Sequence, residues 1–306
     1  AGLNGISYVI YKKCPSIVFH LHRIILKIWE RKDIPSDWAV AYIALIAKTS
    51  DLDNPAEFRP IAVGNTAGKI FFTIIANRLA NFLLSNRYIK IQKQKGFLEG
   101  MSGCLEHSFV LWEALRNARE NTRAIVITWI DLANAYGSVR HNLIQFALDW
   151  YHVPKDIQIL IFNYYELLRA KIVTEDWSTS FFLFDIGCFQ GCVLSAILFD
   201  CVFNLLLDFL EPMNSLGYKF TVSKRINMDQ AYADDLAITT RTKKGNQLVL
   251  DKIDKWLQWT KTMRAKPKKC VSTAMRQFTS GSKSRDGCIP LSDTVYSPYD
   301  PLKDCW

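Results

Sequence analysis

Three aspartates lie inside apolar segments of this sequence, and their type and position make them the best candidates for chemistry. Asp131 follows the β-branched run 124–130 (AIVITWI), while Asp234 and Asp235 stand side by side within 231–240 (AYADDLAITT). An ionised carboxylate in apolar surroundings is unstable unless an opposite charge compensates it. Neither segment contains a Lys or Arg, so the sequence indicates a bound divalent cation as the compensating charge.

Carboxylate oxygens are hard ligands of the kind that Mg²⁺ or Mn²⁺ prefers. Three carboxylates around two such ions are suited to an in-line displacement at phosphorus. One ion then activates an attacking hydroxyl, and the other stabilises a leaving pyrophosphate. The alternative is a pair of aspartates in an ordinary turn, because a short YxDD pattern also arises by chance. The pattern alone leaves both interpretations open.

Two elements must position these acids. Adjacent side chains in an extended strand point to opposite faces, so we expect Asp234 and Asp235 at a tight hairpin turn that brings both carboxylates toward a shared ion. Asp131 would complete the site from the end of a central strand at 124–132. Hydrophobic periodicity predicts the other elements. The predicted helices cover 17–31, 69–85, 105–119, 149–171 with a break at Pro154, a long segment from Leu194, and 247–263, and the predicted strands cover 39–47 and 178–184.

Helices and strands that do not alternate regularly predict an α+β fold rather than a doubly wound sheet. The segment 39–47 (AVAYIALIA) has no charged residue and is typical of a buried strand. In the helix predicted at 105–119, we expect Trp112 and Leu115 on the apolar side that faces the core.

The composition is that of a folded protein with affinity for polyanions. Of 306 residues, 49% are hydrophobic, and 38 Lys and Arg against 29 Asp and Glu give a formal net charge of +9. These values exclude a collagen-like or disordered chain, and the positive charge favours nucleic acid as a partner. The eight cysteines include no CxxC pair and no zinc-like spacing. We therefore expect reduced thiols in an intracellular protein.

We expect no membrane-spanning segment. The apolar stretch 17–29 is interrupted by two His, an Arg and a Lys. The run 193–210 is more apolar, but Asp200, Asn204 and Asp208 recur at every fourth residue and form one stripe along a helix. A charged side chain at the bilayer centre costs about 2.5–3.5 kcal/mol. The pattern therefore favours a buried helix of a soluble protein.

Six segments in a fixed order carry a resemblance to a known family. They are 57–79 (EFRPIAVGNTAGKIFFTIIANRL), 94–107 (QKGFLEGMSGCLEH), 129–141 (WIDLANAYGSVRH), 187–199 (GCFQGCVLSAILF), 231–238 (AYADDLAI) and 263–270 (MRAKPKKC). Together they resemble the reverse transcriptase domain of a non-LTR (LINE-type) retrotransposon. The resemblance runs from about Pro35 to Phe278, which is most of the chain.

The resemblance implies a role for each matching position. The catalytic positions would be Asp131, Asp234 and Asp235, and the same three acids with Leu132 would be the metal-binding positions. The nucleotide-binding positions would be Lys48, Arg59, Ala133, Tyr136, Gln190, Gly191 and Lys269. The metal would be Mg²⁺, with Mn²⁺ as the alternative. The ring of Tyr136 would exclude a ribose 2′-hydroxyl. Lys269 would lie near the leaving pyrophosphate, and Lys268 is the alternative because 264–266 departs from the family pattern.

The resemblance also implies the fold and its division into domains. The fold would be that of a right-hand polymerase, with an antiparallel palm sheet and flanking helices. A helical extension would cover 1–34, the fingers 35–123, and the palm 124–278 with a fingers-like insertion at about 140–178. We expect 279–306 to be a loop-rich tail that ends before a thumb, in a piece of a larger polyprotein.

The implied activity is RNA-directed DNA synthesis, in which dNTPs are added to a primer 3′-hydroxyl on an RNA template. The partners would be the RNA template, a DNA primer or nicked target, and dNTPs, in an intracellular protein that is nuclear or shuttles between cytoplasm and nucleus. One alternative is an RNA-directed RNA polymerase, which Tyr136 and the Ala233 in place of Gly disfavour. The other is a catalytically inactive relic that binds RNA. The oligomeric state stays open.

For some of these residues a purely structural role is also open. Tyr136 could pack in a core, Gln190 could stabilise a turn, and Arg59 could be an ordinary surface residue. Arg59 precedes a proline and should be extended, as in a strand that projects into solvent. The basic run 261–269 follows Trp256 and Trp259, and is either a solvated face or a track for a nucleic-acid backbone.

Overall fold

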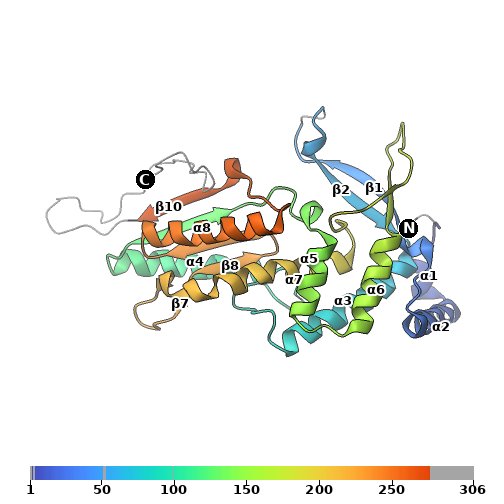
Figure 1. The fold of residues 1–306 in the computed structure, drawn as a ribbon, viewed down its shortest axis with the longest axis horizontal. Coiled ribbons are helices and arrows are strands. Elements are labelled where there is room, and N and C mark those ends of the chain that lie inside the picture. The colour runs from blue at the N-terminus through green and yellow to red at the C-terminus, as the bar shows by residue number, and fades with distance from the viewer. Residues whose placement is uncertain (1, 3, 51–52, 99, 276–306) are drawn as a thin grey trace. The chain divides into compact units, whose positions relative to one another are not determined.

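The computed structural model describes residues 2, 4–50, 53–98 and 100–275 (Figure 1). The chain divides into two compact units. The first unit contains Ala1–Tyr88 and Tyr136–Phe199, and the second contains Ile89–Ala135 and Asp200–Trp306. Both units combine helices with a sheet, which confirms the α+β prediction. The units differ in extent from the predicted fingers and palm, whose boundaries stay a prediction. The predicted tail at 279–306 lies outside the described residues.

The second unit is built on a four-stranded antiparallel sheet with the order β10-β3-β9-β8. Its strands are β3 (Ile125–Ile130), β8 (Asp229–Tyr232), β9 (Asp235–Thr240) and β10 (Val271–Met275). The predicted central strand is thus confirmed as β3, whose apolar residues are buried with the exception of Trp129. A strand buried on both faces needs apolar residues at successive positions rather than alternation.

Helices cover the two faces of this sheet. Ala114 and Ala118 of α4 (Gly103–Glu120) pack against Ile125 and Ile127 on one face. On the other face, the hydroxyl of Thr128 donates to Oδ1 of Asn246 in α8 (Lys243–Thr260) at 2.8 Å. The N-terminus of α8 is capped by Thr242, whose side chain accepts from Gly245 N.

The expectation for the apolar side of α4 was wrong for Trp112 and right for Leu115, which packs partly buried against the core cluster. Trp112 is 56% exposed, and the guanidinium of Arg116 lies over its ring at 5.3 Å. The helix instead turns its two buried alanines to the sheet, because small side chains let a helix approach the strands closely. Hydrophobicity alone predicts that Trp112 faces the core, but close packing of the helix on the sheet places Ala114 and Ala118 there instead.

The first unit holds the other four-stranded sheet, with the order β2-β1-β4-β5. Its strands are β1 (Val40–Ala47), β2 (Phe58–Gly64), β4 (Arg169–Ile172) and β5 (Phe182–Leu183). β1 and β2 form an antiparallel hairpin, and β4 runs parallel to β1. The prediction that 39–47 is a buried strand was wrong in its burial. Only its start alternates between buried and exposed residues, and its last two residues are exposed.

The helices of the first unit are α1 (Tyr8–Lys13), α2 (Pro15–Arg31), α3 (Thr66–Ser85), α5 (His141–Trp150) and α6 (Lys155–Leu167). Phe72 of α3 contacts Tyr164 of α6, with ring centroids 4.3 Å apart. The break predicted at Pro154 is confirmed, because α5 ends at Trp150 and α6 begins at Lys155, whereas the prediction that the helix continues to 171 was wrong. Pro154 caps the start of α6, Leu168 is extended, and the chain continues into β4. The strand predicted at 178–184 is confirmed only as the short β5.

The long helix α7 (Val193–Leu210) confirms the segment predicted from Leu194. Two helices are long and apolar enough to cross a membrane, α3 and a window that begins with α7, and 44% and 78% of these windows are buried inside the protein. Burial of this extent is typical of core helices. Shorter elements complete the described chain: β6 (Tyr218–Lys219), β7 (Ile226–Asn227), and the 3₁₀ turns Ser36–Ala39, Pro55–Glu57, Tyr136–Ser138, Glu211–Leu216 and Pro267–Lys269.

The cysteines within the described residues are free thiols, as expected. They are Cys14, Cys104, Cys188, Cys192, Cys201 and Cys270. Burial raises the pKa of Cys188 to about 12, so this thiol stays protonated and unreactive at neutral pH.

Candidate catalytic site

The two adjacent aspartates lie at a tight hairpin, as predicted. Tyr232 at the end of β8 pairs with Asp235 at the start of β9, so Ala233 and Asp234 form a two-residue turn. Ala233 has a φ of +53°, the left-handed conformation that such turns require of their first residue. A residue other than glycine pays about 1–2 kcal/mol for this conformation, so other contacts must hold the turn.

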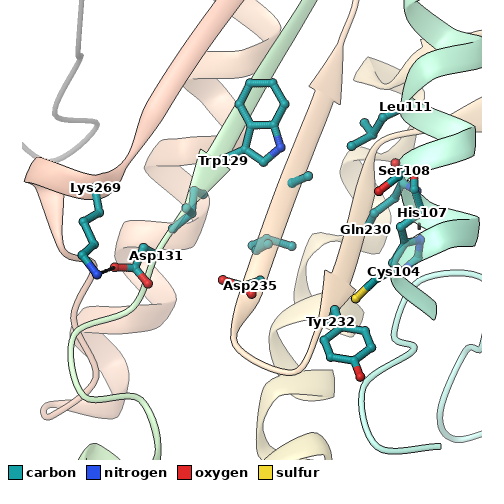
Figure 2. Close-up of a pocket in the computed structure, with 13 residues that line it drawn as sticks. Cys104, His107, Ser108, Leu111, Trp129, Asp131, Gln230, Tyr232, Asp235 and Lys269 are labelled. Carbon is teal, nitrogen blue, oxygen red and sulfur yellow. Dashed lines mark hydrogen bonds and ion pairs between the residues drawn. The ribbon is translucent and has the colours of Figure 1, made fainter. Parts of the chain in front are cut away.

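Asp131 reaches the same place from the neighbouring strand. The register of β3 and β9 pairs Ile130 with Leu236, and its continuation by one residue sets Asp131 opposite Asp235. The carboxylate of Asp131 lies 3.8 Å from Nζ of Lys269. Figure 2 shows this ion pair as a dashed line, with Asp235 close by at the start of β9.

The segment that carries Lys269 holds the backbone around Asp131. Lys266 N donates to Asp131 O at 2.7 Å, and Ala133 N donates to Arg264 O at 2.8 Å. Leu132 forms an isolated antiparallel bridge with Ala265. These contacts fix the chain just beyond β3, where the sheet has ended. Of the two lysines named from the sequence, Lys269 forms the ion pair with Asp131.

The acids repel one another and are partly desolvated. Burial raises the pKa of Asp234, and the charges of Asp235 and Asp131 raise it further. Burial and the charge of Asp131 likewise raise the pKa of Asp235, while Lys269 opposes that change. Such a group of carboxylates is stabilised by added positive charge, and its oxygen donors are those that Mg²⁺ and Mn²⁺ prefer. The donor chemistry therefore fits the expected metal.

A pocket of about 460 Å³ opens beside these acids. Asp131, Asp235 and Lys269 lie at its charged end, and Trp129 and Leu111 contribute apolar wall (Figure 2). Within the described residues, no three His, Cys, Asp or Glu side chains are gathered closely enough to enclose an ion. The carboxylates thus share an electrostatic environment and an open space, and they are not pre-assembled into a closed cage.

A fourth acid, Asp200 on α7, belongs to this environment and was missed as a site residue by sequence reasoning. Its exposure is 0%, and neither carboxyl oxygen has a hydrogen-bond partner among the described residues. Burial raises the pKa of Asp200 well above its ordinary value, and the charge of Asp234 raises it further. The sequence does contain a signal for Asp200, namely an acid within an apolar helical segment. From the sequence alone, this acid is interpreted only as part of the polar stripe along that helix.

Replacement of Asp200 by Asn is expected to stabilise the protein at pH 8 and to change its stability much less at pH 5. A carboxyl whose pKa is higher in the folded state makes the free energy of unfolding fall as the pH rises above the ordinary value of 3.8. Asn carries no titrating proton and avoids this pH-dependent loss.

Denaturant unfolding at both pH values measures this difference. Asp208→Asn is the matched control on the same helix, because Asp208 is only partly buried and lies 3.7 Å from Lys90. The control should be neutral or slightly destabilising. A gain for Asp200→Asn that is equal at pH 5 and pH 8 would contradict the buried protonated carboxyl.

In the first unit, Lys48 and Arg59 lie at the end of the β1–β2 hairpin where the connecting loop joins the two strands. Lys48 N donates to Glu57 O at 2.7 Å, and Arg59 stands opposite Ile46. Both side chains are exposed, and Arg59 is extended as predicted. The hairpin thus presents two basic side chains at the same end.

The other predicted residues of the first unit lie on a turn that packs against this hairpin. Gln190 O accepts from Ala62 N of β2 at 2.7 Å. Gly191 has a φ of +101°, and a Cβ there would lie 2.7 Å from Ala62 O, so only glycine fits. Tyr136 O accepts from Cys188 N at 2.8 Å. The structure therefore brings Tyr136, Gln190 and Gly191 together through one backbone segment.

Tyr136 stacks on Phe199, with ring centroids 4.6 Å apart and an interplanar angle of 13°. Its ring is partly buried, so packing and a role in substrate selection are compatible. The basic run 261–269 begins at the left-handed Lys261 that ends α8. Trp256 is buried and Trp259 is 51% exposed, so only the latter is available to a nucleic acid.

Comparison with known proteins gives consistent findings. The family described as Reverse transcriptase (RNA-dependent DNA polymerase) matches residues 46–284. The Pol polyprotein of the retrotransposable element R2DM of Drosophila melanogaster is 29% identical over 294 aligned positions, and the match covers 92% of this chain and 27% of that protein. The R2 polyprotein of Nasonia vitripennis is 26% identical, over 90% of this chain and 26% of that protein.

Solved structures extend the likeness to the fold. The apo telomerase of Candida tropicalis, truncated from its C-terminal domain, has a TM-score of 0.57 at 14% identity, and covers 88% of this chain and 56% of that chain. The telomerase of the same organism in complex with a fragment of telomeric RNA has a TM-score of 0.56 at 15% identity, and covers 85% and 45%. The chain spans about a quarter of the length of the curated relatives it matches.

Proposed function

Because the chain belongs to the reverse transcriptase (RNA-dependent DNA polymerase) family, we propose that it carries the nucleotidyl-transfer site of an RNA-directed DNA polymerase within a non-LTR retrotransposon polyprotein. The observation that supports this best is the placement of Asp131 and the acid hairpin on adjacent strands. The acids raise one another's pKa values, and Lys269 lies close to them. This arrangement suits a site that binds cations and stabilises the negative charge of phosphate groups.

In the proposed reaction, the 3′-oxygen of a primer attacks the α-phosphorus of a dNTP. A new O–P bond forms, the bond to the β-phosphate oxygen breaks, and pyrophosphate leaves with its electron pair. Two Mg²⁺ ions, or Mn²⁺ in their place, supply charge stabilisation for this displacement when bound. Asp131, Asp234 and Asp235 would hold these ions, together with the backbone of Leu132.

The remaining predicted residues would bind and orient the nucleotide. Lys48 and Arg59 would contact the triphosphate, for which the planar guanidinium is well suited. Ala133 would supply backbone beside the triphosphate, and Gln190 with Gly191 would flank the nucleotide and template. Lys269 would leave Asp131 as metal binds and place its ammonium near the departing pyrophosphate. These assignments rest on the match of motifs and on the contacts within each unit.

The proposed partners are an RNA template, a DNA primer or nicked target, and dNTPs. The net charge of +9 favours association with a nucleic-acid backbone, and such binding should weaken steeply as salt is added. We also propose the fingers and palm boundaries given by the motifs, and a nuclear or shuttling location, because a chromosomal target would be reached in the nucleus.

Primer extension tests the proposal directly. With a homopolymer RNA template, an annealed DNA primer, dNTPs and Mg²⁺, we expect the primer to lengthen, and we expect EDTA to stop extension. NTPs in place of dNTPs should give little product, and ready incorporation of NTPs would indicate an RNA polymerase instead. RNA binding without extension would indicate the inactive relic, and extension in EDTA would exclude the metal site.

A further inference from the structure

The buried amide of Gln94 holds the turn of the acid hairpin. Gln94 has an exposure of 0%. Its Oε1 accepts from Ala233 N at 2.9 Å and from Gly96 N at 2.8 Å, and its Nε2 donates to Ala233 O at 3.2 Å. Both backbone polar groups of the left-handed turn residue are therefore satisfied by one side chain, 139 positions away in the sequence.

The backbone around Gln94 lies along the edge of β8. Lys95 N donates to Ala231 O at 3.0 Å, and Ala231 N donates to Lys93 O at 2.7 Å. A Cβ on Gly96 would lie 2.3 Å from Ala233 N, so glycine is required for this close approach. The backbone at Gly96 therefore packs directly against the turn.

Gly103 and His107, further along the chain, also contact β8. A Cβ on Gly103 would lie 3.1 Å from the ring of Tyr232. His107, which is buried, contacts Ala231 O through Nε2 at 3.0 Å, and its Nδ1 lies 2.9 Å from Nε2 of Gln230. The carbonyl requires a proton on Nε2, so Nδ1 accepts from the glutamine amide. Residues 94–98 and 100–107 therefore form a brace around β8 and the turn.

The energetic consequence falls on the turn. Ala233 is 3% exposed, so water cannot replace the amide if Gln94 is removed. The buried N–H and C=O groups would then be unpaired, at a cost of about 1–3 kcal/mol each, on top of the left-handed backbone. The turn would relax into another conformation, and Asp234, the next residue, would move with it.

We propose that Gln94 is a positioning residue that sets the orientation of the acids at 234 and 235 through the conformation of Ala233. This inference rests on the proposed function, since it assigns to Gln94 the geometry of the proposed catalytic acids. The side-chain hydrogen bonds of Gln94 go to the backbone of Ala233 and Gly96. Its effect should therefore appear in the chemical step and in metal binding, not in recognition of the dNTP.

Gln94→Met removes both hydrogen-bonding functions while keeping a similar size and shape. We expect kcat for dNTP addition to fall about 10–100-fold, because misplacement by about 1 Å costs up to this factor. The KM for dNTP should change less than about threefold. The Mg²⁺ concentration for half-maximal activity should rise.

Gln158→Met is the matched control in the first unit. Gln158 is 2% exposed, and its amide donates to Val153 O at 2.9 Å and to Asp149 at 3.0 Å. Its loss should lower stability to a comparable degree and leave kcat near that of the parent. A fall in kcat of equal size in both variants would reduce Gln94 to a general structural role.

A second substitution tests the turn itself. Ala233→Gly in the Gln94→Met background should restore part of kcat, because glycine adopts a positive φ without steric cost. The same change should not restore the stability of Gln158→Met. Parent-like kcat in Gln94→Met, or no rescue by Ala233→Gly, would overturn the proposal.

Amide hydrogen exchange separates this inference from the proposed function. The N–H of Ala233 should be protected in the parent and in Gln158→Met, and should exchange rapidly in Gln94→Met. If the parent protein does not extend a primer, the proposed function fails, and the exchange rates still decide whether Gln94 holds the turn. If the N–H of Ala233 stays protected from exchange in Gln94→Met, Gln94 does not stabilise the turn.

Discussion

Replacement of Asp234 by Ala is expected to lower the rate of primer extension by about 10³-fold or more and to leave the protein folded. Loss of one carboxylate from three weakens the binding of both ions, and the charge stabilisation that they supply in the transition state is the largest single contribution to such a reaction. Folding should not suffer. The raised pKa of Asp234 comes from burial and from repulsion by Asp235 and Asp131, and the substitution removes both costs.

Affinity for RNA should be nearly unchanged in the same variant, because it depends on contacts between basic residues and phosphates. Single-turnover extension and a binding titration measure the two properties separately. Asp251→Ala on α8 is a suitable control, since this exposed carboxylate accepts from Gln247 on its own helix at 2.8 Å. Equal activity in Asp234→Ala and the parent would remove Asp234 from the metal site.

Tyr136→Ala is expected to let the enzyme use ribonucleotides. An aromatic ring rejects a 2′-hydroxyl by occupying its space, and exclusion of this kind is worth about 10–100-fold in kcat/KM. The stack on Phe199 holds the ring in one orientation, as a steric filter requires. The ratio of kcat/KM for a dNTP to that for the matching NTP should fall by this factor.

Tyr136→Phe distinguishes the ring from the hydroxyl. It keeps the stack and the steric volume, so the selectivity of the parent should be retained. A change in selectivity in Tyr136→Phe would indicate a hydrogen bond instead of steric exclusion. Unchanged selectivity in Tyr136→Ala would leave Tyr136 with a packing role only.

The hairpin and the central strand could be predicted because their signals are local. A β-branched run defines β3, and two acids between apolar strand residues leave a turn as the sensible place for them. The family was predicted from six motifs in order and is confirmed. The individual roles of the nucleotide-binding residues stay predictions, since they concern molecules other than this chain.

The residues that sequence reasoning missed act through distant contacts. Nothing near Gln94 indicates that its amide will meet Ala233, and nothing near Asp200 indicates that it will face Asp234. The helix α4 shows the same difficulty, because Ala114 and Ala118 carry weaker hydrophobic signals than Trp112 does. In each case the contact forms between segments that are distant in the sequence, so the local sequence pattern does not predict it.

The strands of the sheet in the second unit are translated in the order β3, β8, β9 and β10, and this order has a consequence for folding on the ribosome. All three acids have been translated once residue 235 is made, yet β3 still lacks its neighbour β10, and the backbone of Asp131 still lacks the hydrogen bond from Lys266. A nascent chain that stalls in α8 therefore holds the three proposed catalytic carboxylates in an unfinished sheet. Under the proposed function, copying has to wait until 264–275 leaves the exit tunnel and closes the open edge of β3.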